Sequence, residues 1–78
     1  MSHVDLPDVL VHVDETLGHD AVKELEGVLR ADPGVITVAI HEDKPHLVVV
    51  QFDPELTGAN RILQRVTDHG LHAQLVGM

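Results

Sequence analysis

The sequence predicts an α+β domain in which a four-stranded antiparallel sheet is covered on one face by two helices. Two stretches with helical spacing alternate with β-branched stretches, so the order of elements is βαββαβ in one unbroken unit. The chain has 78 residues, of which 44 % are hydrophobic, and this is enough for one small core but not for two. We assign residues 8–78 to this domain and residues 1–7 to a flexible lead-in.

The first half of the chain predicts a strand, a helix and a second strand. From Val9, the sequence VLVHV alternates valines with other residues, which is typical of a strand with one buried face. Helical order begins near His19, and its apolar face is made by Ala21, Val22, Leu25, Val28 and Leu29. Pro33 and Gly34 end this helix, and the alternating, β-branched residues 35–40 form the second strand.

The second half predicts a strand, a helix and a last strand. A polar turn, HEDKP, leads into LVVVQF over residues 47–52. We expect Thr57 to cap a second helix, whose apolar face comprises Ala59, Ile62, Leu63 and Val66. Gly70 is expected to end that helix, and LHAQLV over residues 71–76 completes the sheet.

Phe52 decides how the second and third strands pair. It is the only aromatic residue and is costly to expose, so we expect it to face the core. The core then also receives Val38, Ile40, Val48 and Val50. This pairing needs a connection of odd length, which puts His46 in the turn and His41 on the outer face. A four-residue loop that pairs His41 with His46 would turn Phe52 outward.

Composition excludes several classes of function. Five basic and thirteen acidic residues give a net charge of −8, which repels nucleic acid and anionic membranes. No apolar run approaches the roughly 18 residues of a membrane span, and the acidic start MSHVDLPD has no signal core, so we expect a cytoplasmic protein. The chain has no cysteine and no serine or threonine in a motif with a partner base. We therefore do not expect an enzyme.

Four segments, in matching order and spacing, resemble one family. They are AVKELEGVL, DPGVITVAI, VQFDPELTG and ILQRVTDHGLHAQLV. The chain is similar, from about Val9 to Val76, to the heavy-metal-associated domain of copper chaperones and metal-transporting ATPases. This resemblance implies a ferredoxin-like βαββαβ sandwich and a binding role.

The metal motif of that family is missing. The family pattern Gly-Met-Thr-Cys-x-x-Cys, aligned on the first helix, falls on residues 15–21 of this chain. Its two cysteine positions are Gly18 and Ala21, and its methionine position is Thr16. Two thiolates hold the soft ion Cu(I), and nothing here replaces that pair. Cu(I) transfer is therefore not expected of this chain.

Seven histidines in 78 residues offer other metal ligands. Histidine and carboxylate suit Zn(II), Ni(II), Co(II) or Cu(II). We expect His19 and Asp20, between the former cysteine positions, to lie near Asp68 and His69 before the last strand. The alternative is that these four residues are only the polar ends of two helices, where Asp20 and His69 suit the helix dipoles.

Two further groups of histidines are candidates. His12 and His72 point away from the helices on strands expected to be neighbours, so they form a secondary candidate pair. His41 and His46 flank an acidic turn, where exposed histidines without a ligand are the simpler interpretation.

The outer sheet face is unexpectedly apolar, since it carries Leu10, Ala39, Leu47, Val49 and Val76. Such a face predicts a partner, either a second copy or a larger metal-handling protein. Two hypotheses follow. The first is a non-enzymatic binding module with a divalent-metal site of histidine and carboxylate. The second is a protein-interaction module that uses this face without any metal.

Overall fold

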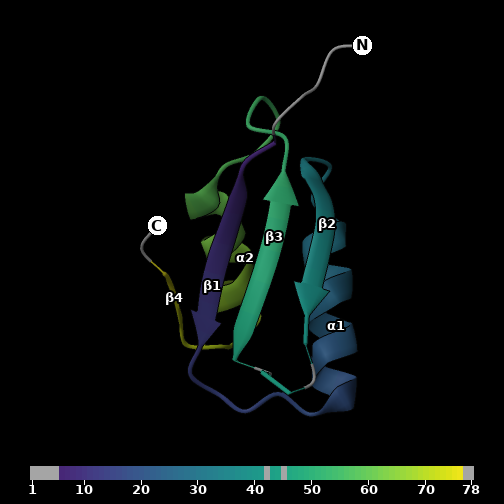
Figure 1. Ribbon diagram of the computed structural model, residues 1–78, viewed down its shortest axis with the longest axis vertical. Helices are drawn as coiled ribbons and strands as arrows, with labels where there is room; N and C mark the ends of the chain where they lie inside the picture. The colour runs from purple at the N-terminus through teal and green to yellow at the C-terminus, as the bar shows by residue number, and fades with distance from the viewer. Residues whose placement is uncertain (1–5, 42, 45, 77–78) are drawn as a thin grey trace.

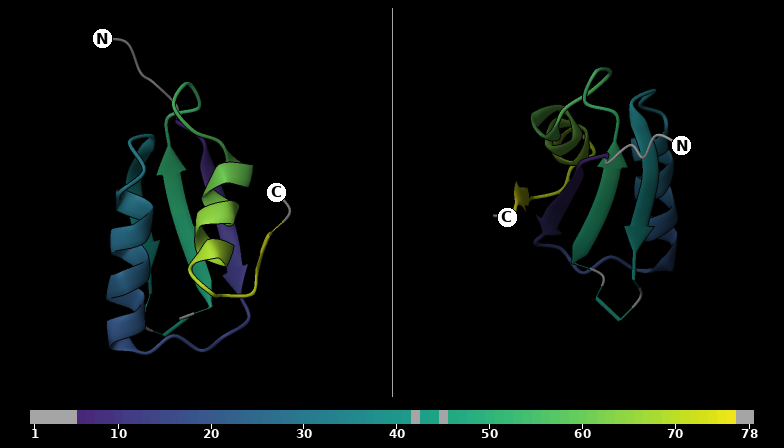
Figure 2. Two further views of the ribbon diagram at one scale, coloured as in Figure 1. Left: turned by 180° about the vertical axis from the view of Figure 1, so that it is seen from behind. Right: turned by 45° about the horizontal axis from the view of Figure 1, so that its top comes forward.

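The fold is a four-stranded antiparallel sheet with both helices on one face, as the sequence predicts (Figures 1 and 2). This computed structural model describes residues 6–41, 43–44 and 46–76. The strand order is β2-β3-β1-β4, so the first and last strands are neighbours. The elements are β1 (Asp8–Val13), α1 (His19–Arg30), β2 (Val35–Ile40), β3 (Leu47–Phe52), α2 (Ala59–Asp68) and β4 (Ala73–Leu75).

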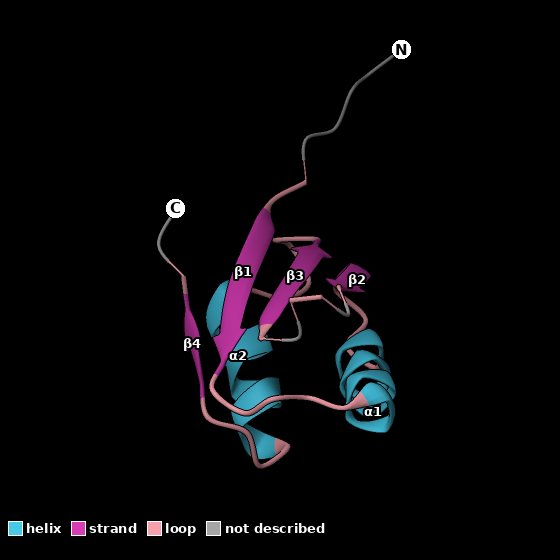
Figure 3. Cartoon of the chain, turned by 60° about the horizontal axis from the view of Figure 1, so that its bottom comes forward, coloured by secondary structure: helices cyan, strands magenta, loops and turns pink. Residues whose placement is uncertain are grey.

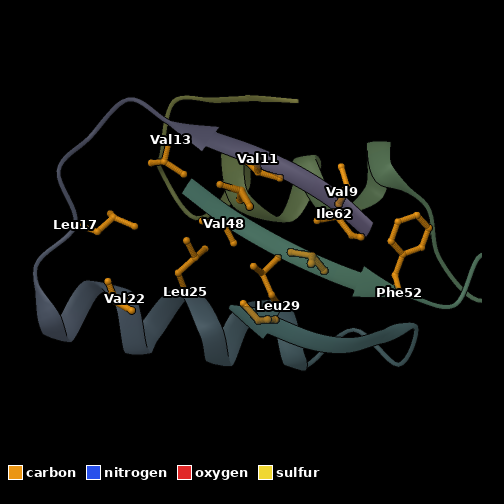
Figure 4. Packing of buried hydrophobic residues seen from close by; sticks show 13 residues of the cluster. Val9, Val11, Val13, Leu17, Val22, Leu25, Leu29, Val48, Phe52 and Ile62 are labelled. Carbon is orange, nitrogen blue, oxygen red and sulfur yellow. The ribbon is translucent and has the colours of Figure 1, made fainter. Parts of the chain in front are cut away.

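The core lies between the sheet and the helices, and Figure 4 shows its side chains converging from both layers. The inward side chains of β1 and β3 meet Leu25 and Leu29 of α1 and Ile62 of α2, all three fully buried. Phe52 is also buried, and Ile40 stands opposite Val48 in the register. The predicted pairing of the hairpin is therefore confirmed, with His46 in the turn.

Two boundary predictions were wrong. The strand β4 covers Ala73–Leu75 rather than residues 71–76, because the N–H of His72 bonds to the Glu15 carboxylate instead of a strand. The residue that caps α2 is Gly58, with no side-chain cap, because the Thr57 hydroxyl donates to Asp32 instead, at 3.2 Å. Of the lead-in, residues 1–5 lie outside the described residues, and Pro7 O accepts a hydrogen bond from Phe52 N.

Asp32 is the one buried acidic side chain among the described residues. Its Oδ1 accepts the Gly34 N–H at 2.9 Å, and its Oδ2 lies 2.7 Å from Arg65 Nε and 3.3 Å from Arg61 Nε. Burial raises the pKa of Asp32, but the bonds from Gly34, Arg65 and Thr57 and the Arg65 charge outweigh it. The pKa of Asp32 is therefore lowered, and this charged group joins the end of α1 to α2.

Gly34 is required by close packing, beyond its role in ending a helix. A Cβ added there would lie 2.5 Å from Thr57 Cγ2 and 3.0 Å from Leu56 Cβ. Thr57 has little freedom to move away, because its hydroxyl is bonded to Asp32. The segment Asp32–Gly34 thus fixes how the turn after α1 lies against the turn before α2. None of the described helices is long and apolar enough to cross a membrane.

Candidate functional site

All the histidines that the structure describes lie at one end of the sheet. Antiparallel strands and the two helices alternate in direction along the chain, so the ends that carry these residues meet there (the lower end in Figure 1). His3 lies outside the described residues. We call this the histidine end, and its six residues are His12, His19, His41, His46, His69 and His72. It is also the end at which the loop between β1 and α1 lies (Figure 3).

His46 is anchored to the end of β1 twice. Its backbone O accepts the Val13 N–H at 2.8 Å, and its ring Nδ1 lies 2.9 Å from Val13 O. A carbonyl oxygen only accepts, so Nδ1 must carry the proton. In the neutral ring, Nε2 then holds the lone pair, and the Thr16 hydroxyl lies 3.4 Å from it. His46 therefore holds the loop after β1 against the turn before β3.

His12 stacks on His46, with ring centroids 5.8 Å apart and an angle of 14° between the planes. Its Nδ1 is buried and, within the described part of the chain, has no hydrogen-bond partner. The nearest acid is Asp14, whose Oδ1 lies 3.6 Å from this nitrogen. A buried ring nitrogen without a partner needs an explanation, and a bound ligand is one.

His72 is paired with Glu15, across a separation of 57 residues in sequence. The His72 Nδ1 donates to Glu15 Oε2 at 2.7 Å, and the His72 backbone N–H donates to Oε1 of the same carboxylate at 2.9 Å. These bonds lower the pKa of Glu15. The bond and charge of Glu15 also raise the pKa of His72, with a smaller contribution from the charge of Asp14.

Asp14 stands between the two secondary candidates. The register places His12 opposite Gln74, while the Asp14 N–H donates to His72 O at 2.8 Å. His12 and His72 are therefore diagonal neighbours rather than a direct cross-strand pair. A hollow of about 570 Å³ opens beside His72 and is lined by Asp14, Thr67, Gly70, Leu71, His72, Ala73 and Gln74. One carboxylate, of Asp14, and one imidazole, of His72, therefore lie on the wall of this hollow.

The primary candidates sit on two different helix ends. His19 and Asp20 open α1, while Asp68 closes α2 and His69 is its C-cap. Asp68 Oδ1 accepts the Gln64 Nε2–H at 2.8 Å, and Asp68 and His69 line a smaller hollow with Val28 and Arg65. Across residues 6–41, 43–44 and 46–76, no group of three or more histidine or acidic residues is arranged to hold a metal.

Gly18, one of the two positions aligned with the family's cysteines, has open space for a side chain. A Cβ added at Gly18 meets nothing within 4 Å, and its φ of −76° and ψ of 174° are extended backbone that any residue adopts. Gly18 is the N-cap of α1, and Ala21 lies in the first turn. The loop therefore has the space for a side chain at Gly18 that this sequence does not place there.

Four of the predicted apolar residues of the outer face, Leu10, Ala39, Leu47 and Val49, lie in β1, β2 and β3 at positions that share one face. The register sets Ala39 opposite Val49 and Val49 opposite Leu10, so these three form one row across β2, β3 and β1. Leu47 follows at the next outward position, opposite His12. Leu10, Leu47 and Val49 are half-buried and Ala39 is exposed. We call the row made by Leu10, Val49 and Ala39 the outer row.

Two contacts at the histidine end were missed from the sequence. His46 was considered with His41, but it stacks on His12, while His41 is exposed just after β2. Glu15 orients His72, a contact that the sequence pattern does not predict. The pairing of β1 with β4 carries the signal for the second contact, because it brings the residues after β1 to the start of β4.

Replacing Glu15 by glutamine is expected to lower the pKa of His72 toward its ordinary value of 6.5. The folded pKa of His72 is raised, so its contribution to stability is present below pH 6.5 and is lost as the pH rises through the folded pKa. Glu15 has a lowered pKa, so its contribution is present above its ordinary value of 4.5 and is lost as the pH falls through the folded value. The stability that Glu15→Gln loses relative to the wild type should therefore be largest between pH 4.5 and pH 6.5.

The measurement is an NMR titration of the His72 ring, with urea unfolding at several pH values. Glu24→Gln, which alters an exposed acid on α1, is the matched control and should leave the His72 pKa unchanged. An unaltered His72 pKa in Glu15→Gln would show that the contact does not form in solution.

Comparison with solved structures identifies the fold. The chain is similar to a copper-binding domain from HMA7, a P-type ATPase, with 21% identity, 90% of this chain and 93% of that chain covered, and a TM-score of 0.81. It is similar to oxidized MerP from Ralstonia metallidurans CH34, with 16% identity, 94% and 100% coverage, and a TM-score of 0.82. The yeast copper transporter domain CCC2A matches with 21% identity, 90% and 94% coverage, and a TM-score of 0.79.

The fold is therefore that of the heavy-metal-associated domains, and the fold that the resemblance implied is confirmed. No family model and no curated protein sequence matches the chain. The chain has no cysteine, and the end of the sheet at which the loop between β1 and α1 lies carries histidines and acids.

Proposed function

We propose that this chain is a non-enzymatic binding module that holds a divalent transition-metal ion at its histidine end. The observation that carries the proposal is the gathering of six histidines, from six element ends, at the end where the loop between β1 and α1 lies. The copper-binding domains that share the fold support a metal-handling role, although their identity with this chain is low. Larger metal-handling proteins are the partners that such a role implies.

The donors that lie best are His12, Asp14 and His72. Asp14 is within 3.6 Å of the His12 ring, and its charge acts on His72. The side chains of His12 and His72 are 40% and 82% exposed, and metal binding requires these rings to turn, because the three groups are not arranged around one ion in the described structure. Glu15 holds the Nδ1 of His72, which leaves Nε2 as the ligand atom, and such carboxylate–histidine pairs are usual behind metal ligands.

The chemistry of these donors selects the ion. Imidazole nitrogen and carboxylate oxygen suit Zn(II), Ni(II), Co(II) and Cu(II), whereas Cu(I) prefers sulfur. Neutral imidazole is the ligand form, and because the bond and charge of Glu15 raise the pKa of His72, protons compete with the metal at a higher pH than for an unperturbed histidine. Metal affinity is therefore expected to fall as the pH drops through the histidine range.

The test is a titration of untagged protein with each of the four divalent ions, followed by NMR. Shifts at His12, Asp14 and His72 that end near one ion per chain are the expected result. Shifts confined to residues 18–21 and 67–70 would instead select the set His19, Asp20, Asp68 and His69. If no ion perturbs the histidine end, the proposal is wrong.

Variants sharpen this titration. Glu15→Gln is expected to weaken metal binding about 10- to 100-fold, the usual cost of losing a residue that orients a ligand. His72→Asn should weaken it at least as much. His41→Asn removes an exposed histidine at the same end that is not one of the three proposed donors, so it serves as the matched control, with unchanged affinity.

A second candidate function rests on the outer row. Leu10, Val49 and Ala39 lie side by side across three strands, which gives an apolar strip on the face away from the helices. We propose that a protein partner docks on this strip if no metal is bound. Lysine at Val49 would then abolish partner binding while leaving the metal titration unchanged, which separates the two functions.

A further inference from the structure

The strand β2 is an edge strand with few of the usual protections. It pairs with β3 on one side, and in the described chain no strand pairs with its other side. Its sequence, VITVAI, holds no charge, proline or glycine and is rich in β-branched residues. An edge of this kind presents unpaired N–H and C=O groups to another strand.

The opposite edge of the sheet is protected by its shortness. The strand β4 has only three residues, and short edge strands are one way in which proteins prevent pairing with another chain. The six residues of β2 carry a single irregularity, a shift in register between Val35 and Thr37. Beyond this shift, Thr37–Ile40 pair regularly with β3, and Thr37 and Ala39 are exposed. A second strand therefore has a regular ladder to extend.

We propose that β2 pairs antiparallel with β2 of a second copy of this chain, which makes one continuous sheet from the two domains. A two-fold dimer brings the same segment from both copies together, and an antiparallel strand pair satisfies this condition. Residues directly opposite in a sheet point to the same face, so the two-fold axis must pass between the two copies of one residue, which then stand opposite each other. We place Ala39 at the axis, since the new strand pair is then centred on the part of β2 that follows the shift in register.

Apolar continuity favours a second copy as the occupant. The net charge of −8 makes two chains repel each other, and β2, which has no charged side chain, is an edge at which the contact itself adds no like charges. The Ala39 centre also sets Ala39 opposite Ala39 of the second copy. The outer rows of both copies then join end to end across the new strand pair.

Cross-linking tests this geometry directly, because the chain has no cysteine of its own. Ala39→Cys is expected to form a disulfide-linked dimer under mild oxidation, since directly opposed side chains in a strand pair are close enough to bridge. The matched control is Leu10→Cys, on the same face but two strands away, which should cross-link far more slowly. Equal rates in the two variants would indicate stacking of the outer faces and would overturn the proposal.

Sedimentation of untagged protein in a metal chelator provides the second measurement. Edge pairing buries less than a standard interface, so we expect a weak dimer, with a Kd on the order of 0.1 mM. Ala39→Lys sets two like charges opposite each other and should weaken association at least about tenfold. Gln51→Lys makes the same change in net charge on β3 and should leave association unchanged. A wild-type chain that stays monomeric up to about 1 mM would overturn the proposal.

The chelator keeps this test independent of the proposed function. Dimerisation without metal supports edge pairing whether or not the histidine end binds an ion. A dimer that forms only when a divalent metal is added would contradict edge pairing and point to a bridging metal instead.

Discussion

Replacing Asp32 by alanine is expected to lower the free energy of unfolding by about 2–4 kcal/mol. The substitution leaves the buried Gly34 N–H without its acceptor and removes the carboxylate that Arg61, Arg65 and Thr57 share. Arg65 and Arg61 are 31% and 57% exposed and regain water, which keeps the cost below that of a fully buried pair. Urea unfolding measures the change.

Asp32→Asn and Asp53→Ala are the companion variants. Asparagine keeps an acceptor but loses the charge, so its stability should lie between alanine and wild type. Asp53 is a turn residue whose side chain accepts one N–H bond, from Glu55, and the loss of this side chain should cost less than about 1 kcal/mol. A cost for Asp32→Ala no larger than that of Asp53→Ala would contradict the role given to this network.

The effect of Asp32 depends on pH in a definite direction. Its folded pKa is lowered, so its contribution is present above its unfolded value of 3.8 and is lost as the pH falls through the folded value. The stability difference between wild type and Asp32→Asn should therefore be full at neutral pH and should shrink in acid. A difference that stays constant down to acidic pH would show that Asp32 is not charged in the fold.

Placing cysteines at Gly18 and Ala21 together is expected to give a chain that binds one Cu(I) ion tightly. The resemblance to the heavy-metal-associated domain puts the family's thiolates at these positions, and nothing lies within 4 Å of an added Cβ at Gly18. Both positions are at the start of α1, where the helix dipole favours the thiolate form. Competition with a coloured Cu(I) chelator, under reducing conditions, measures the affinity.

The control for this variant carries serine at both positions. Serine is nearly the same size but has no sulfur, so it should not compete with the chelator for Cu(I). Failure of the cysteine pair to retain Cu(I), in a variant that unfolds like the wild type, would show that the loop differs from that of the copper-binding domains in more than its side chains.

The fold was predictable because its signals are local and agree with each other. Periods in hydrophobicity place both helices and the first three strands, and the single aromatic residue Phe52 sets the register of the hairpin. The errors arose where a tertiary contact replaced a local one. Asp32, 25 residues earlier in the chain, accepts the Thr57 hydroxyl, which therefore does not cap α2. Glu15 takes the N–H of His72 and shortens β4.

The candidate site was less predictable for a related reason. The sequence and topology together place histidines at one end, but they do not say which ring meets which. That depends on side-chain rotamers and on carbonyls such as Val13 O, which fixes the tautomer of His46. The stack of His12 on His46 joins β1 to the turn before β3, so no spacing along the chain marks it.

The bond between Glu15 and His72 couples the loop after β1 to the start of β4, so a change in one affects the other. The strand β4 is short, and its entry is held by one carboxylate from the loop after β1. A molecule that draws Glu15 away from His72 therefore loosens the last strand, although it touches only the first loop. The Val76 N–H bonds to Leu10 O at the other end of β4. The rate of amide exchange at Val76 should therefore rise when a molecule bound at the loop after β1 breaks the bond between Glu15 and His72.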